Sequence, residues 1–366
     1  KVDLAIRRIT STAGVPNFTI LPGNGAGGFG TPFELTLALA GQFTYSRQLA
    51  VIDANLDGKA DILISRQGGF FLYNGSSALF TRTENDFDGD LRTDLSVYRP
   101  SIGTWFINRS TNGITAQQFG IASDKPAAAD YDGDGRTDLA VWRESASAFF
   151  HIFQSSTNTY RFEQFGQTGD VLTVNDWDGD GKADASVYRD SAIGSQSYFF
   201  YRGTLNNPNG TITFVPWGTV GDKAARGDFD GDGKADAAIF RPSNGVWFIL
   251  QSSNNQGRAQ QFGTAADRRV PADYDGDGKT DIAIVRPANN DWYILNSATG
   301  TAAYRQWGAN SDALIPGDYN GDGRTEISTY RAAEGNWYIP QCADFRQAVT
   351  KFGATGDVAV PSTLLP

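Results

Sequence analysis

Seven short segments of this chain carry oxygen-bearing side chains at a spacing that suits a bound cation. They read DANLDGKAD (53–61), DFDGDLRTD (86–94), DYDGDGRTD (130–138), DWDGDGKAD (176–184), DFDGDGKAD (228–236), DYDGDGKTD (273–281) and DYNGDGRTE (318–326). Ca2+ is held by about six to eight oxygen atoms, which a tight loop can present from alternate side chains and one backbone carbonyl. Glycine at positions 4 and 6 permits the turn that this arrangement needs. The spacing therefore predicts about seven Ca2+ sites.

The predicted ligands are the side chains at positions 1, 3, 5 and 9 of each loop and the backbone carbonyl at position 7. In chain order they are Asp53, Asn55, Asp57, Lys59, Asp61, Asp86, Asp88, Asp90, Arg92, Asp94, Asp130, Asp132, Asp134, Arg136, Asp138, Asp176, Asp178, Asp180, Lys182, Asp184, Asp228, Asp230, Asp232, Lys234, Asp236, Asp273, Asp275, Asp277, Lys279, Asp281, Asp318, Asn320, Asp322, Arg324 and Glu326. The first and last loops depart furthest from the pattern, because Asn55, Asn320 and Glu326 replace aspartates. We expect these two sites to be the weakest.

The segments that follow the loops exclude an EF-hand. An EF-hand needs a glutamate at loop position 12 and flanking helices, whereas this chain has Ile, Val or Thr at that position. The residues after each loop (DILIS, DLSVY, DLAVW, DASVY, DAAIF, DIAIV and EISTY) are rich in β-branched and aromatic side chains, which is typical of strands. Each loop is therefore predicted to be a turn between two strands.

Most of the acidic residues in the chain lie at the predicted ligand positions of the loops. Loop positions 1, 3, 5 and 9 hold 26 of the 41 acidic residues. Seven bound Ca2+ ions would change the formal charge from −10 to about +4. Basic residues are scattered singly, so we expect no nucleic-acid partner. The chain also has no apolar stretch long enough to span a bilayer.

The loops belong to a longer repeat. Most of them begin 44 to 52 residues apart, a period typical of β-propellers with about four strands per blade. Each unit adds an arginine five residues after the loop, an aromatic strand, a Phe-Gly or Trp-Gly turn and, five residues after the turn's aromatic residue, an aspartate. Because they recur in every unit, we interpret the arginines as architectural. The repeated Trp105, Trp247, Trp292 and Trp337 suit packing between blades better than sugar stacking.

The two ends of the chain suggest how the ring closes. Residues 1–6 resemble the second strand of a unit, and residues 356–366 resemble a first strand. These ends predict an all-β fold: a single β-propeller domain over residues 1–366 with eight four-stranded blades. Its C-terminal strand would pair with residues 3–7 of the N-terminal blade. Seven blades is the alternative, because the 33-residue interval between the first two loops lacks a full strand.

The loop, the strand after it, the Phe-Gly turn and the period together resemble FG-GAP/VCBS-type repeats, the family that includes the propeller of integrin α-chains. The resemblance covers nearly the whole chain. It implies a calcium-binding β-propeller in which Ca2+ lies between the first two strands of a blade.

No catalytic or further cofactor-binding residues are predicted. The chain has one histidine, His151, and one cysteine, Cys342, and neither has a recognisable catalytic partner. We expect a non-catalytic scaffold for adhesion or assembly that binds protein or glycan. Two alternatives stay open: a propeller-type polysaccharide lyase or other glycan-active enzyme, and a structural subunit of a larger cell-surface assembly. The non-repeating segments 22–32 and 190–215 are the expected binding regions.

Ca2+ loops of modest affinity suit an extracellular or cell-surface location. The chain starts with Lys1 and contains no methionine, so we expect that an N-terminal segment is absent from it.

Overall fold

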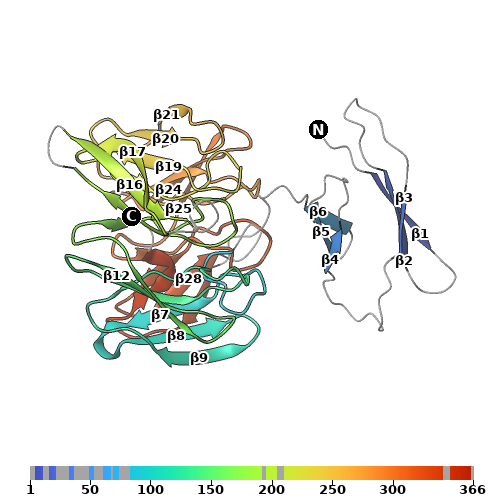
Figure 1. Cartoon of the computed structure of the whole chain (residues 1–366), viewed down its shortest axis with the longest axis horizontal. Coiled ribbons are helices and arrows are strands. Elements are labelled where there is room, and N and C mark those ends of the chain that lie inside the picture. The colour runs from blue at the N-terminus through green and yellow to red at the C-terminus, as the bar shows by residue number, and fades with distance from the viewer. Residues whose placement is uncertain are drawn as a thin grey trace. The chain divides into compact units, whose positions relative to one another are not determined.

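The computed structural model describes residues 83–191, 195–203, 210–340 and 347–363, together with the backbone of six strands between residues 5 and 73 (Figure 1). The chain divides into two compact units, Lys1–Leu79 and Phe80–Pro366. The organisation of residues 1–366 as a single domain stays a prediction. Because the loop at 53–61 is described only at Asp61, its other residues lie outside the described part of the chain. The proposed binding segment 22–32 and residues 192–194 and 204–209 of the proposed segment 190–215 also lie outside it.

The smaller unit contains two antiparallel sheets of three strands each. The first is ordered β1 (Ala5–Thr10), β2 (Pro16–Leu21) and β3 (Phe33–Thr36), and the second is ordered β4 (Leu49–Ile52), β5 (Asp61–Arg66) and β6 (Gly69–Tyr73). In both sheets neighbouring strands are consecutive in sequence. Neither described sheet has the four strands of a complete blade.

The larger unit is a β-propeller of six four-stranded antiparallel blades. Five blades are built from consecutive strands: β10 (Lys125–Pro126), β11 (Leu139–Arg143), β12 (Phe149–Phe153) and β13 (Tyr160–Gln164); β14 (Val171–Leu172), β15 (Ala185–Arg189), β16 (Gln196–Arg202) and β17 (Thr213–Thr219); β18 (Lys223–Ala225), β19 (Ala237–Arg241), β20 (Val246–Leu250) and β21 (Gly257–Gln261); β22 (Arg268–Arg269), β23 (Ile282–Arg286), β24 (Asp291–Leu295) and β25 (Ala302–Gln306); β26 (Ala313–Leu314), β27 (Thr329–Arg331), β28 (Asn336–Pro340) and β29 (Gln347–Lys351).

The sixth blade joins the two ends of the larger unit. Its strands are β30 (Val358–Ala359), β7 (Leu95–Arg99), β8 (Thr104–Arg109) and β9 (Gly113–Gln118), in that order. Val358 pairs with Tyr98 and Ala359 with Val97, and the C-terminal segment lies beside β7 in Figure 1. Two short 3-10 helices, η1 (Pro100–Ile102) and η2 (Val360–Ser362), follow β7 and β30.

This closure corrects the blade count. The prediction of eight blades, and the alternative of seven, were both wrong, because the ring has six. The C-terminal strand does close the ring, but its partner is β7 rather than residues 3–7. The physical reason is that β7 takes its first strand, β30, from the C-terminal end of the chain, whereas each of the other five blades is built from consecutive strands. Periodicity alone could not tell which of the two strands would receive the C-terminal one.

The blades pack through large apolar side chains. The second strands β11, β15, β19 and β23 are buried at four successive positions, as expected of strands covered on both faces. Trp105, Trp142, Trp247, Trp292 and Trp337 have no exposed surface. Their indole N–H groups donate to backbone carbonyls at Phe-Gly or Trp-Gly turns over 2.7–3.2 Å. The packing interpretation of the repeated tryptophans is therefore confirmed.

The repeated arginines also have an architectural contact. Each forms a two-point ion pair, with N–O distances of 2.7–3.1 Å, with the aspartate that precedes the first strand of the same blade. The pairs are Arg99–Asp357, Arg143–Asp124, Arg189–Asp170, Arg241–Asp222, Arg286–Asp267 and Arg331–Asp312. These pairs fasten the first strand of each blade to the second.

None of the helical segments in the described part of the chain has the length and hydropathy to cross a bilayer.

Candidate metal centres

Each of the six described loops precedes the second strand of its blade, and the carboxylate at position 1 organises the loop from inside. In the 130–138 loop, Asp130 accepts hydrogen bonds from the backbone N–H groups of Gly133 (2.6 Å) and Gly135 (2.9 Å). The equivalent bonds recur in the other five loops, at 2.6–2.7 Å for position 4 and 2.7–2.9 Å for position 6. A carboxylate that accepts several N–H groups holds the turn closed.

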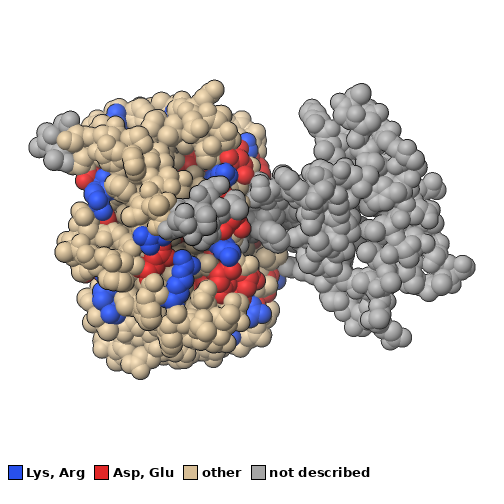
Figure 2. All heavy atoms as spheres, in the orientation of Figure 1, with Lys and Arg blue, Asp and Glu red and all other residues tan. Residues whose placement is uncertain are grey.

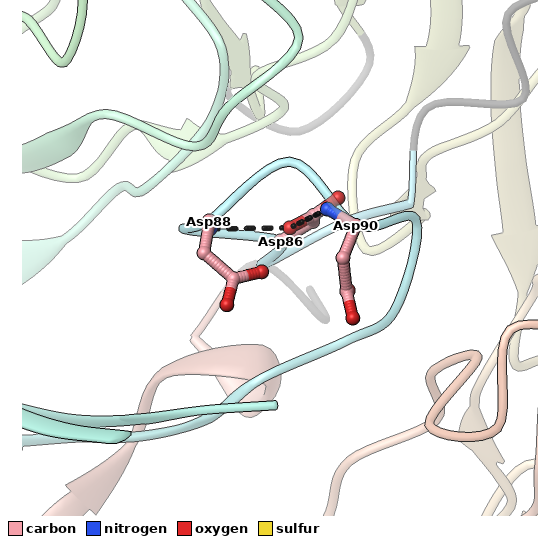
Figure 3. A group of neighbouring side chains, drawn as sticks. All are labelled: Asp86, Asp88 and Asp90. Atoms are coloured by element: carbon pink, nitrogen blue, oxygen red, sulfur yellow. Dashed lines mark hydrogen bonds between the residues drawn. The ribbon is translucent and has the colours of Figure 1, made fainter. Parts of the chain in front are cut away.

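Carboxylates at positions 3 and 5 lie beside the first. Figure 3 shows Asp86, Asp88 and Asp90, with the N–H groups of Asp88 and Asp90 directed at Asp86. One carboxylate oxygen of the position-5 aspartate accepts the N–H of position 7 at 2.8–3.0 Å in all six loops. The carbonyl oxygens at position 7 stay predicted ligands.

The acid at position 9 is the most buried member of the cluster. Asp94, Asp138, Asp184, Asp236 and Asp281 are each at most 2% exposed. One oxygen of each accepts the N–H of the aromatic residue at position 2, over 2.7–2.9 Å. The ninth residue of these five loops is therefore placed under the turn, directly before the second strand.

Burial of so many carboxylates raises their pKa values. Loss of solvent is the largest cause, and neighbouring acids add to it. The pKa rises to about 7 for Asp94 and Asp236, to about 8 for Asp184 and to about 6 for Asp138. Two first-position acids, Asp228 and Asp273, also rise to about 6. A bound cation would favour the charged forms again, because an opposite charge within a few ångströms outweighs the cost of burial.

Three carboxylate oxygens in these loops are buried without a hydrogen-bond partner among the described residues: Asp88 Oδ1, Asp184 Oδ1 and Asp275 Oδ1. A buried acceptor without a partner is costly, so its presence needs an explanation. A cation at the centre of the loop would supply the missing interaction.

Within a loop, carboxylate oxygens from different acids lie close to one another. Six groups in the described part of the chain have one ligand atom from each residue within 4.8 Å of the others, and five of them are Asp86, Asp88 and Asp90; Asp130, Asp132 and Asp138; Asp176, Asp178 and Asp184; Asp228, Asp230 and Asp236; and Asp273, Asp275 and Asp281. The atoms of these five groups are all carboxylate oxygens, the ligand type that Ca2+ prefers. Three predicted ligands are thus brought together in each of these loops: positions 1, 3 and 5 in the 86–94 loop, and positions 1, 3 and 9 in the other four.

The last loop follows the same plan with different residues. Glu326 accepts the N–H of Tyr319 at 2.8 Å, and Asn320 donates its side-chain N–H to Glu326. Burial and nearby carboxylates raise the pKa of Glu326 to about 8. Because Asn320 is uncharged, this loop offers one carboxylate fewer than its neighbours.

The six loops are linked head to tail in a closed ring. The N–H of position 8 in each loop donates to the carbonyl of position 1 in the preceding loop, over 2.6–2.8 Å. The ring closes where Thr93 donates to Asp318. The side chain at position 7 covers the position-4 glycine of the same neighbour: a Cβ on Gly133, whose φ is +85°, would lie 3.0 Å from Lys182 Cε. Acidic and basic side chains consequently lie side by side on the ring (Figure 2).

Sequence reasoning missed a set of serines that contact the loop acids. Ser110, Ser155, Ser252 and Ser297 follow the third strands β8, β12, β20 and β24, and each donates its backbone N–H to the acid at position 9. The signal was present as a repeated Ser after the aromatic strand, in the stretches RST, QSS, QSS and NSA.

His151 lies in the third strand of its blade, at a position where other blades have a phenylalanine or a tyrosine. It pairs with Val141, as Phe106 pairs with Val97 and Phe248 with Ile239. Burial, followed by the charge of Arg143, lowers the pKa of His151. Five other repeated arginines lie 4.4–4.7 Å from the ring centroid at this position. This geometry suits a structural role for His151.

Comparisons with known proteins place these features in a family. The model of the FG-GAP-like repeat matches residues 86–141 and 273–328. Each match starts at the first residue of a described loop and ends at the second strand of the next blade, within β11 for the first match and directly before β27 for the second. No curated protein sequence matches the chain significantly.

Solved structures resemble the chain only distantly. An Agrocybe aegerita lectin that recognises non-reducing terminal N-acetylglucosamine is 15% identical with a TM-score of 0.43, and the match covers 74% of this chain and 91% of the lectin. A Bacteroides thetaiotaomicron protein of unknown function is 13% identical with a TM-score of 0.35, covering 95% and 98%. Virginiamycin B lyase from Staphylococcus aureus is 9% identical with a TM-score of 0.40, covering 74% and 87%. Similarity at this level supports no functional argument. The repeat match and the six-bladed ring, in contrast, agree with one another: this chain is a β-propeller protein that contains FG-GAP-like repeats.

Proposed function

We propose that this propeller is a non-catalytic scaffold stabilised by Ca2+, with one ion in each of its six ring loops and a seventh in the 53–61 loop. The observation that carries the proposal is the repeated convergence of buried carboxylate oxygens, three of which lack a partner among the described residues. Six copies of one arrangement around a ring suit an architectural ion better than a catalytic one.

The donor set favours Ca2+ over other divalent cations. Every clustered ligand atom is a carboxylate oxygen, whereas Zn2+ sites usually include histidine or cysteine. Mg2+ keeps several water molecules and is seldom held by a dedicated all-protein cage. A loop with up to four acids and one carbonyl matches the larger coordination number of Ca2+.

An extracellular or cell-surface location follows from the ion. Loops of this kind with modest affinity would fill where Ca2+ is abundant, which is outside the cytosol. There the propeller would present a rigid ring to a protein or glycan partner, as adhesion and assembly modules do. This part of the proposal depends on Ca2+ occupancy and is tested with it.

The first experiment counts the ions. Native mass spectrometry of chelator-treated protein during a Ca2+ titration should show about seven bound ions, and Asp132→Asn should remove one of them. Mg2+ at the same concentration serves as the control for non-specific charge neutralisation. Protein that binds no Ca2+, or that binds Mg2+ equally well, would contradict the proposal.

The second experiment measures the contribution of the ions to stability. A ligand that binds only the folded state stabilises it by about 2.7 kcal/mol per site at a hundredfold excess over Kd. Several such sites together reach the net stability of a typical domain, about 5–15 kcal/mol. EDTA should therefore lower the melting temperature steeply, and an unchanged melting curve would contradict the stabilising role.

The scaffold role itself calls for a partner screen. A glycan array and a panel of polysaccharide substrates, each with Ca2+ and with EDTA, would separate binding from turnover. We expect calcium-dependent binding without cleavage. Cleavage that a substitution of His151 abolishes without changing the melting temperature would overturn the non-catalytic assignment.

A further inference from the structure

Four serines hold the same place next to four of the candidate Ca2+ loops. In each of these blades, one residue near the end of the third strand pairs with the first residue of the second strand, and the serine follows two positions later. The pairs are Asn108–Leu95, Phe153–Leu139, Leu250–Ala237 and Leu295–Ile282, and the serines are Ser110, Ser155, Ser252 and Ser297. The antiparallel register therefore brings the turn after the third strand back over the loop that precedes the second strand.

Each serine contacts two acids of one loop. Its backbone N–H donates to Oδ1 of the ninth-position aspartate at 2.7 Å in three blades and 2.6 Å in the fourth. Its hydroxyl donates to the fifth-position aspartate, at 2.7 Å for Ser110 and at 2.9–3.0 Å for the other three. One residue thus fixes two carboxylates that belong to different ends of the loop.

The next residue contacts a third acid. The hydroxyls of Thr111, Ser156 and Ser253 donate to Oδ2 of the third-position aspartates Asp88, Asp132 and Asp230, over 2.7 Å for Ser156 and 2.6 Å for Ser253. In the fourth blade this residue is Ala298, which offers only its backbone N–H, at 3.2 Å from Asp275.

The blade with the 176–184 loop has a threonine at the equivalent place. Its third strand ends at Arg202, which pairs with Ala185, so the equivalent sequence position is Thr204, outside the described residues. The contact is therefore described for the four blades named above.

We propose that Ser110, Ser155, Ser252 and Ser297, with the hydroxyl residue that follows three of them, are positioning residues for the Ca2+ ligands. The inference rests on the proposed Ca2+ binding and adds a second layer of residues to it. Three or four carboxylates within a few ångströms repel one another, and donors fixed behind them hold the oxygens in place before the ion arrives. Loss of such outer partners typically weakens metal affinity about 10–100-fold.

The test uses the 228–236 loop of the full chain. Ser252→Ala and the double variant Ser252→Ala with Ser253→Ala remove hydroxyls but keep the backbone N–H groups. Ser252→Thr keeps the hydroxyl and serves as the conservative rescue. Ser101→Ala, an exposed serine that follows a second strand away from the loops, is the matched control. Native mass spectrometry during a Ca2+ titration reports the ions bound, and circular dichroism confirms the fold.

We expect one site of the double variant to weaken about 10–100-fold, so that one ion fewer is bound at Ca2+ concentrations that just saturate the wild type. Ser252→Thr and Ser101→Ala should keep the wild-type count. A double variant with wild-type count and affinity would overturn the inference while leaving the proposed function intact, whereas a wild type without bound Ca2+ would overturn the proposed function first.

A gain-of-contact variant keeps the inference testable if the double variant does not fold. Ala298→Ser supplies the hydroxyl that the 273–281 loop lacks. We expect tighter binding at that site, seen as an ion bound at a lower Ca2+ concentration than in the wild type. Unchanged affinity would count against a positioning role for this hydroxyl.

Discussion

Arg99 and Asp357 form a two-point ion pair that joins the beginning of the six-bladed ring to its end. The distances are 2.7 Å from Nε to Oδ1 and 2.9 Å from Nη2 to Oδ2, between residues 258 positions apart. In the other five blades the equivalent arginine and aspartate are only 19 positions apart. The same local contact therefore closes the ring in one blade and fastens consecutive strands in the rest.

Replacing Arg99 by alanine should destabilise the ring. Asp357 has no exposed side-chain surface, whereas Arg99 is 31% exposed, so the substitution leaves a buried carboxylate without its cation. We expect a loss of about 2–3 kcal/mol in the free energy of unfolding, below the larger cost of breaking a fully buried pair. Urea denaturation is the measurement, and Arg241→Ala, which removes an equivalent pair between neighbouring strands, is the comparison. An unchanged denaturation midpoint for Arg99→Ala would show that the pair contributes nothing.

Deleting residues 357–366 should destabilise all six blades together. The deletion removes β30 from β7, removes the partner of Arg99 and removes Val360, which is 1% exposed, from the core. A ring without its closing strand has two open edges. We expect one cooperative thermal transition at a lower temperature, and deletion of 364–366 alone is the control because it keeps β30 and η2. A truncated protein that melts like the full chain would refute the closure.

Metal-free protein should lose stability as the pH rises. Burial raises the pKa of Asp94 to about 7 and the pKa values of Asp184 and Glu326 to about 8. The folded state therefore retains protons that the unfolded chain releases above its ordinary carboxyl pKa. This contribution to stability is complete below about pH 4 and is lost as the pH rises through about 7–8. With EDTA, the melting temperature should fall between pH 5 and pH 8.

Calcium should reverse that trend, because the ion binds the deprotonated carboxylates. The difference in melting temperature between Ca2+ and EDTA should therefore grow from pH 5 to pH 8. A difference that is the same at both pH values would contradict the assignment of these acids as ligands.

His151→Phe should leave the fold intact. Phe106, Phe200 and Phe248 occupy the equivalent position under an arginine in other blades. A phenylalanine would restore that contact with Arg143, which is worth about 0.5–1 kcal/mol at a partly exposed site. We expect a small rise in the free energy of unfolding for His151→Phe and a fall for His151→Ala. A fall for both variants would point to a specific function of the imidazole.

The sequence predicted the local features of this fold well because each is repeated and short-range. The six described loops, the strands that follow them and the place of the loops between first and second strands all agree with the spacing of aspartate and glycine. Because the loop is repeated, the pattern of positions 1, 3, 5 and 9 can be recognised even where one copy departs from the consensus, as at Leu91 and Asn320.

The number of blades could not be predicted in the same way. Residues 358–359 resemble every first strand, and such a strand can pair with any second strand that lacks its own partner. The short interval before Leu95 indicates a missing strand there, but the repeat period alone also fits one uninterrupted ring. Pairing over 258 positions depends on three-dimensional competition between partners, which periodicity does not report.

The serines beside the loops were missed for a related reason. Ser110 and Ser252 lie 16 positions beyond the acids they contact, so only the register of the second and third strands shows that they belong to the site. The spacing within the nonapeptide identifies the ligands but not the residues that lie behind them.

Because β30 is the last strand to be synthesised, the blade that contains β7 can be completed only after the rest of the ring has left the ribosome. A nascent chain that has emerged only as far as residue 340 lacks the innermost strand of the blade that contains β7, and that blade presents an open edge. Exposed edges pair readily with other chains, and partly synthesised proteins are prone to such misassembly. Between the emergence of β7 and the emergence of β30, this edge of the propeller is therefore open to pairing with another chain.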